Sequence, residues 1–172
     1  VDIDENNQTL TFSAVSSDSS LVVVTAETQG DGTAGTLTFD VQDEQNGEAQ
    51  ITVTVTDSEG GTASEMFTLT VNAVNDVPIL TLIGDQVTDE DTDFSIDLSA
   101  LDVDIDENNQ TLTFSAVSSD ESLVMVSTTT DEGDGTAGTL TFDVLAEQNG
   151  SAQITVTVTD SEEATDSEVF TL

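Results

Sequence analysis

Apolar and polar residues alternate one by one along several stretches of the chain. In residues 50–56, Ile51, Val53 and Val55 alternate with glutamine and threonine. A period of two places successive side chains on opposite faces of an extended strand, so one face of each strand is buried. The same pattern, rich in threonine and valine, recurs at 9–15, 36–41, 66–71 and 93–99. No segment of useful length has helical periodicity, and the pattern therefore predicts an all-β fold.

The chain also repeats itself. Residues 1–18 recur without change at 103–120, and residues 49–59 recur at 152–162. The offset grows from 102 to 103 residues, which places one extra residue in the second copy near Asp131. Solenoid repeats are about 20–50 residues long, whereas a period near 100 is the length of an autonomous β-sandwich.

Turn-forming glycines separate the predicted strands, and the Gly-Asp-Gly loops at 30–32 and 133–135 are expected to be plain turns. The second copy contains seven predicted strands, near 79–83, 93–99, 111–117, 123–128, 139–145, 152–159 and 167–172. This number predicts tandem Greek-key β-sandwich modules of the immunoglobulin or cadherin type. We expect a partial module at 1–75, lacking its first two strands and poorly stable alone, and a nearly complete module at 76–172, both cut from a longer array.

Composition excludes several functions. The chain has 36 acidic residues and no lysine, arginine or histidine, so its formal net charge is −36. Binding to nucleic acid or to an anionic membrane needs basic side chains. Without histidine, cysteine, lysine, arginine or tyrosine, the chain also lacks the usual catalytic bases and nucleophiles, and we expect no enzyme. Such a charge implies a cationic partner.

The best candidate for cation binding is the loop that follows residues 93–99. It carries aspartate at every second position and then asparagine: Asp102, Asp104, Asp106 and Asn108. Calcium takes six to eight oxygen ligands from carboxylates, amides and carbonyls, and short aspartate side chains hold the backbone close to the ion. The alternative is that these acids are solvated loop residues.

Three segments resemble cadherins. The loop starting at Asp102 resembles the cadherin pattern Asp-x-Asp-x-Gly-x-Asn-x-x-Leu-x-Tyr, residues 71–78 resemble the linker between cadherin modules, and Val158-Thr159-Asp160 resembles the Ala-Thr-Asp that ends the sixth cadherin strand. Nearly the whole chain is covered. The sequence is most similar to the cadherin-like and immunoglobulin-like extender repeats of giant bacterial repeats-in-toxin adhesins.

The resemblance implies Ca²⁺ at the junctions between modules. The junction inside the chain would use Asn75, Asp76, Asp102, Asp104, Asn108 and Asp160, with Asp43 or Glu44 from the first module. The upstream junction would use Asp2, Asp4, Asn6 and Asp57, and the downstream junction Glu90 and Glu147. Ala73 stands where cadherins usually have aspartate, and Ala146 matches Asp43, so one or two ions per junction are expected.

The resemblance further implies a secreted, monomeric rod at a bacterial cell surface. Its partners would be neighbouring repeats and calcium, and it would project terminal ligand-binding domains away from the cell. Two alternatives remain open. Threonine rows at 52–56 and 155–159 are suited to binding ice or a polysaccharide. The other alternative is homophilic adhesion. It usually relies on an exposed aromatic side chain, whereas all seven phenylalanines are predicted to face inward.

Overall fold

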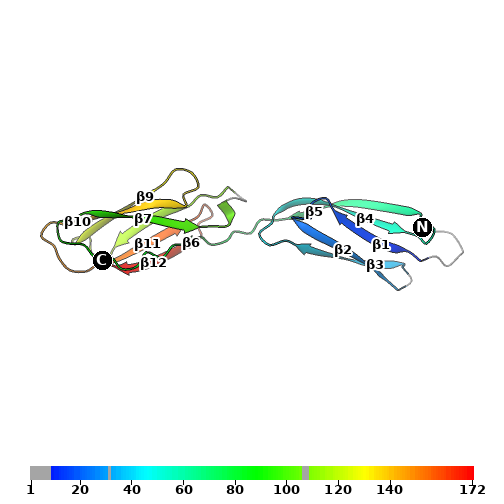
Figure 1. Cartoon of the computed structure of the whole chain (residues 1–172), viewed down its shortest axis with the longest axis horizontal. Helices are drawn as coiled ribbons and strands as arrows, with labels where there is room; N and C mark the ends of the chain where they lie inside the picture. Colours follow the sequence, from blue (N-terminus) through cyan, green and yellow to red (C-terminus); the bar gives the residue numbers. More distant parts are fainter. Residues whose placement is uncertain (1–8, 31, 106–108) are drawn as a thin grey trace. The chain divides into compact units, whose positions relative to one another are not determined.

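A computed structural model of the chain describes residues 9–30, 32–105 and 109–172. The chain divides into two compact units, Val1–Ala73 and Val74–Leu172, each built from β-strands (Figure 1). The described residues form twelve strands, of which five lie in the first unit and seven in the second. No helix in this part of the chain is long and apolar enough to cross a membrane.

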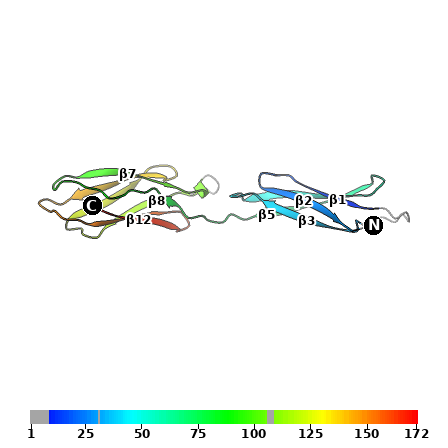
Figure 2. The same cartoon turned by 60° about the horizontal axis from the view of Figure 1, so that its bottom comes forward.

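The second unit is a sandwich of two antiparallel sheets. One sheet has the order β6 (Ile79–Leu80), β7 (Phe94–Leu101), β10 (Ala137–Val144), β9 (Val124–Thr130). The other has the order β12 (Thr165–Thr171), β11 (Gln153–Thr159), β8 (Thr113–Ser118). Figure 2 shows β7 in one layer and β8 and β12 in the other. The arrangement confirms the predicted immunoglobulin-like or cadherin-like β-sandwich.

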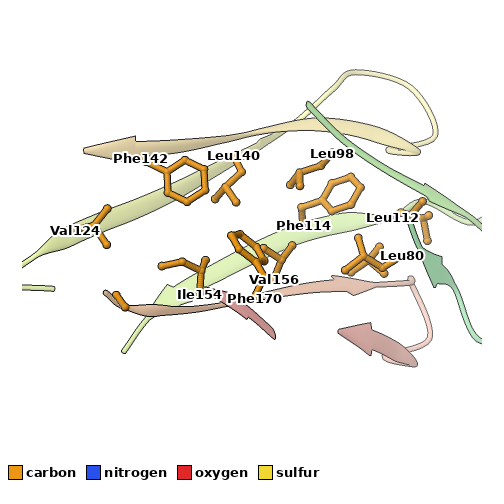
Figure 3. Packing of buried hydrophobic residues seen from close by; sticks show 13 residues of the cluster. Leu80, Leu98, Leu112, Phe114, Val124, Leu140, Phe142, Ile154, Val156 and Phe170 are labelled. Atoms are coloured by element: carbon orange, nitrogen blue, oxygen red, sulfur yellow. The ribbon is translucent and has the colours of Figure 1, made fainter. Parts of the chain in front are cut away.

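The core of the second unit lies between these sheets. Leu140 and Phe142 of β10 point toward Ile154 and Val156 of β11, and all four side chains are fully buried (Figure 3). Phe142 also stacks on Phe94 of β7, with ring centroids 4.3 Å apart and an interplanar angle of 4°. Because one face of each strand is apolar, pairing two such faces removes both from water.

Strand β6 is shorter than the sequence predicts. The expected strand covers 79–83, but the ladder ends at Leu80. Beyond it, the N–H groups of Ile83 and Gly84 donate to the Glu168 carboxylate of β12, at 2.6 and 3.0 Å. The Glu168 carboxylate therefore accepts backbone hydrogen bonds that a neighbouring strand would otherwise accept. The alternation of apolar and polar residues does not predict such a contact.

The first unit contains the counterparts of the last five strands. Its sheets are β1 (Thr11–Ser16), β4 (Gly47–Thr56), β5 (Thr62–Val71), and the pair β2 (Val22–Gln29), β3 (Ala34–Val41). Strand β2 runs five residues beyond the apolar run LVVV at 21–24. It does so because β2 pairs with the whole of β3, from Val22 opposite Val41 to Gln29 opposite Ala34. The backbone hydrogen bonds to β3 keep the polar C-terminal half of β2 in the sheet.

The phenylalanines between the sheets are less buried in the first unit than in the second. Phe39 and Phe67 are 38% and 39% exposed, whereas their counterparts Phe142 and Phe170 are 0% and 3% exposed. The sequence AGTLTFDV around Phe39 is identical to that around Phe142. The difference arises because β6 and β7 cover the core of the second unit, and no described strand takes their place in the first.

Candidate metal centre

Three acidic segments that are distant in sequence meet at one place in the second unit. Asp102 and Asp104 follow β7, Asp160 follows β11, and the segment Asn75–Asp76 precedes β6. The Asp76 N–H donates to Asp104 Oδ2 at 2.7 Å. The Asn75 amide Nδ2 donates to Asp160 Oδ2 at 2.9 Å. Two aspartates therefore hold the segment through which the chain enters this unit.

Asp160 has a second role in its own turn. Its Oδ1 accepts hydrogen bonds from the N–H groups of Glu162 and Ala164, both at 2.8 Å. The matching Asp57 in the first unit makes the same pair of bonds, to Glu59 at 2.9 Å and to Gly61 at 2.8 Å. One oxygen of each aspartate thus stabilises the turn, and in Asp160 the other oxygen remains for the segment at Asn75.

Asp102 carries the most unusual atom of the cluster. Its Oδ1 accepts a hydrogen bond from the Asp104 N–H at 2.9 Å. Its Oδ2 is buried and has no hydrogen-bond partner. A buried carboxylate oxygen without a partner is costly, because it has lost water and gained nothing in return. A bound cation would remove this cost.

The electrostatics of the cluster are unfavourable without a cation. Burial raises the pKa of the Asp102 carboxyl above its ordinary value. The hydrogen bond from the Asp104 N–H opposes this shift, and three neighbouring carboxylates add to it: Asp104, Asp160 and Asp76. Asp104 and Asp160 are only 2% and 5% exposed. The chain has no lysine, arginine or histidine to balance these charges.

Gln110 is a member of the cluster that sequence reasoning missed. It is 4% exposed, its Nε2 donates to Asn75 Oδ1, and its Oε1 accepts from the Ser161 hydroxyl at 3.2 Å. Gln110 therefore connects the entering segment to the turn after β11. The repeat contains one signal, since Gln8 stands at the matching position. A glutamine in an acidic loop is ordinarily exposed, so this signal alone does not identify a buried bridge.

The donors fit a hard cation, although the arrangement is not a complete coordination shell. Carboxylate and amide oxygens are the ligands that calcium prefers. Within residues 9–30, 32–105 and 109–172, no three acidic side chains are placed to ligate one ion together. Asp106 and Asn108 from the same loop lie outside the described residues, as do Asp2, Asp4 and Asn6.

The remaining predicted ligands belong to other loops of the two units. Asp43 and Glu44 are exposed in the loop between β3 and β4 of the first unit. Glu90 and Glu147 are exposed in two loops of the second unit, and the Glu147 N–H donates to Asp91 Oδ1 at 2.8 Å. The structure thus brings Asn75, Asp76, Asp102, Asp104 and Asp160 together, and the metal-binding role of all these residues stays a prediction.

The raised pKa of Asp102 predicts an unusual pH dependence for the second unit in calcium-free buffer. The folded unit takes up a proton at a pH where an unfolded aspartate, which titrates near about 3.9, is still charged. The free energy of unfolding should therefore rise as the pH falls from neutral through the raised pKa, down to about 3.9. Urea unfolding at a series of pH values measures this. Relief of repulsion among the other carboxylates adds to the rise in every variant, so the rise should be smaller in Asp102→Asn, and an equal rise in that variant would contradict the assignment.

A protein-family profile matches both units of the chain. The profile of a family described as bacterial Ig domain matches residues 1–70 and again 75–172. The two matches together cover nearly the whole chain, and the gap between them contains the segment that joins the two units. No curated protein sequence matches the chain.

Several solved structures are similar to the chain. The protocadherin gamma B4 extracellular domain is similar with a TM-score of 0.50 and 20% identity, covering 94% of this chain and 27% of that one. Domains 4 and 5 of the S-layer protein SbsC give a TM-score of 0.39 and 19% identity, covering 92% and 68%. The human desmocollin-1 ectodomain gives 0.43 and 15%, covering 99% and 30%. The chain thus spans less than a third of either cadherin-type ectodomain.

Proposed function

Because this chain belongs to the bacterial Ig domain family, we propose that it is a non-enzymatic extender of a bacterial surface protein, and that calcium orders the joint between its two units. The observation that carries the proposal is the carboxylate cluster around Asn75 and Asp76. It lies where the chain enters the second unit, so an ion there would hold the first residues of that unit.

Composition supports a location outside the cell. Calcium is scarce in the cytosol, and a formal net charge of −36 without compensating cations opposes compact folding there. The chain has no cysteine, so disulfides do not take the stabilising role that they have in many extracellular domains. A bound divalent cation would stabilise the fold in place of disulfides, and it suits this acidic composition. The chain would then fold fully only after export.

The ligand chemistry supports calcium at this cluster. Asp102 Oδ2 is the buried oxygen without a partner, and Asp104 and Asp160 already hold the entering segment. We propose that these three carboxylates, with Asp76 and the loop at Asp106 and Asn108, supply the oxygen ligands. When bound, calcium would offset their mutual repulsion. Because Asn75 and Asp76 are tied to the same side chains, the entering segment would lose freedom to rotate.

The first test is thermal unfolding with and without calcium. Extracellular calcium modules typically bind with Kd near 10⁻⁴–10⁻³ M, and at 100 times Kd one site adds about 2.7 kcal/mol. For a unit of this size we expect the melting temperature of the second unit to rise by roughly 10 °C or more. Calorimetric titration should show saturable binding, and magnesium should substitute poorly because it demands a smaller octahedral shell.

The matched variants are Asp104→Asn and Asp143→Asn. Both remove one negative charge from the second unit, but Asp104 is buried in the cluster and Asp143 is exposed on β10. We expect Asp104→Asn to lose most of the calcium-dependent shift and Asp143→Asn to keep it. Equal calcium responses in both variants would show that the cation acts only by general screening, and the proposed site would be abandoned.

Stiffening of the joint needs a separate measurement. Small-angle scattering is recorded in calcium and in chelator. An ensemble fitted to the data gives the range of maximum dimensions that the chain adopts. We expect a narrower distribution, with a longer mean, in calcium than in chelator. Calcium binding at the cluster with an unchanged distribution would leave a stabilising site in the second unit and would rule out the extender mechanism.

A further inference from the structure

Gln110 is a polar residue at a core-facing position. It precedes β8, and the alternate residues that follow it, Leu112 and Phe114, point into the core of the second unit (Figure 3). Gln110 itself is 4% exposed. A buried amide costs free energy unless both of its ends are hydrogen-bonded. A leucine would fill this position without that cost, so the glutamine points to a role for the amide.

The amide closes a ring of hydrogen bonds around the segment that enters the second unit. Asn75 Nδ2 donates to Asp160 Oδ2 at 2.9 Å. Ser161, the next residue along the chain, donates its hydroxyl to Gln110 Oε1 at 3.2 Å. Gln110 Nε2 donates to Asn75 Oδ1 and so completes the ring. The entering segment is therefore joined both to the loop before β8 and to the turn after β11.

The direction of every bond in the ring follows from Asp160. An ionised carboxylate only accepts hydrogen bonds, so the Asn75 side chain turns its Nδ2 toward Asp160 and its Oδ1 toward Gln110. Gln110 must then donate with Nε2, and its Oε1 is left to accept from Ser161. Each amide has one orientation that satisfies both of its neighbours. The ring thus fixes the orientation of Asn75 as well as its position.

Hydrogen bonds of two kinds hold the entering segment. One kind ends on carboxylate oxygens that we propose as calcium ligands, those of Asp104 and Asp160. The other kind is the bond from Gln110 to the amide oxygen of Asn75, which is outside that ligand set. A cation at the cluster competes with the first kind of bond for the same oxygens and leaves the second kind intact. Gln110 is thus able to hold the segment with and without the ion.

The segment needs such a contact before an ion binds. Asp76 brings a carboxylate to a site that already contains three others: Asp102, Asp104 and Asp160. Like charges in a poorly solvated site repel one another, and the chain has no basic side chain to offset them. The Gln110 amide is neutral, so it holds the segment without adding to the repulsion. Holding the segment in place beforehand lowers the ordering cost that an incoming ion must offset.

We propose that Gln110 is a positioning residue of the calcium site: it holds Asn75 and Asp76 on the carboxylate cluster before the ion binds and so raises the affinity of the cluster for calcium. Gln110 acts through Asn75 and is not itself a ligand. The effect on affinity rests on the proposed function, whereas the hold on the segment exists without the ion and is tested separately.

The first measurement uses the full chain in chelator. Hydrogen exchange followed by NMR reports the opening of the Asp76 N–H, which donates to Asp104 when the segment is in place. The net contribution of one buried hydrogen bond corresponds to about a three- to tenfold change in an equilibrium constant. Gln110→Met keeps the length of the side chain and removes both hydrogen-bonding groups. We therefore expect it to speed exchange at Asp76 by about three- to tenfold.

Two further variants and an internal reference separate positioning from stability. Gln148→Met makes the same change at an exposed glutamine and should leave exchange at Asp76 unchanged. Ser161→Ala breaks the ring at its far side and should give a smaller increase. The N–H of Val156, a fully buried residue of β11, reports global unfolding. An equal change at Val156 and Asp76 would show that Gln110 only stabilises the fold, and unchanged exchange at Asp76 in Gln110→Met would show no hold on the segment; either result overturns the proposal.

Calorimetric titration with calcium separates this inference from the proposed function. Gln110→Met should bind the same number of ions as the unaltered chain with about three- to tenfold weaker affinity, and Gln148→Met should bind as the unaltered chain does. If the unaltered chain binds no calcium, the proposed function falls together with the effect on affinity, and exchange at Asp76 in chelator alone decides whether Gln110 holds the segment. If Gln110→Met binds calcium as tightly as the unaltered chain, the amide does not prepare the site and the proposal is withdrawn.

Discussion

Replacing Phe142 with alanine is expected to destabilise the second unit by about 3–5 kcal/mol, the usual cost of removing a fully buried phenylalanine. Phe142 is 0% exposed, stacks on Phe94 and meets Phe170 edge-on at a centroid distance of 6.3 Å. The variant leaves a cavity between the two sheets that the neighbouring strands cannot close without losing their ladder. Calorimetry should show the transition of the second unit lowered by roughly 12 °C or more.

The repeat supplies a control with the same local sequence. Phe39→Ala removes the matching side chain from the identical segment of β3, where the residue is 38% exposed. We expect a cost of only about 1 kcal/mol, because much of this ring is already in contact with water. Equal costs at the two positions would contradict the difference in burial.

Replacing Gly135 with alanine is expected to cost about 3 kcal/mol or more. Gly135 has a φ of +76°, and an added Cβ would overlap the backbone carbonyl oxygen of Leu112. This close approach is fixed by the hydrogen bond from the Leu112 N–H to the Asp134 carbonyl, at 2.8 Å. Because backbone lies on both sides, no side-chain rotation relieves the overlap. Thermal unfolding of the second unit measures the loss.

The same loop offers the matched change Gly133→Ala. Gly133 also has a positive φ, +113°, but an added Cβ would meet open space. Only the backbone strain remains, and we expect a cost of about 1–2 kcal/mol. A Gly133→Ala variant as unstable as Gly135→Ala would mean that conformation alone, and not the contact with Leu112, requires glycine here.

The aspartate between these two glycines forms hydrogen bonds within its own loop. The Asp134 carboxylate accepts hydrogen bonds from the Thr136 N–H at 3.1 Å and from its hydroxyl at 2.8 Å. These bonds hold the pKa of Asp134 below its ordinary value. The aspartate stabilises its own turn, and the glycine after it allows the approach to Leu112. The loop is the plain turn that its composition predicts.

The sequence by itself determined the strands, the two copies and the sandwich. Alternation such as Ile51-x-Val53-x-Val55 is a local property, because a strand has a period of two whatever it packs against. The acidic loop at Asp102 and the segment at Asn75 were also predicted, since both are short motifs with recognisable chemistry. The ends of β2 and β6 were not, because a ladder with β3 and a carboxylate from β12 decide where they stop.

Tertiary structure decided the burial of each residue and the composition of the cluster. Phe39 and Phe142 stand in identical segments, yet one is exposed and the other buried, because burial depends on strands that are distant in the sequence. Gln110 is likewise buried only because Asn75 and Ser161 converge on it. The unpartnered oxygen of Asp102 follows from the same convergence, since desolvation is set by everything packed around an atom and not by its neighbours along the chain.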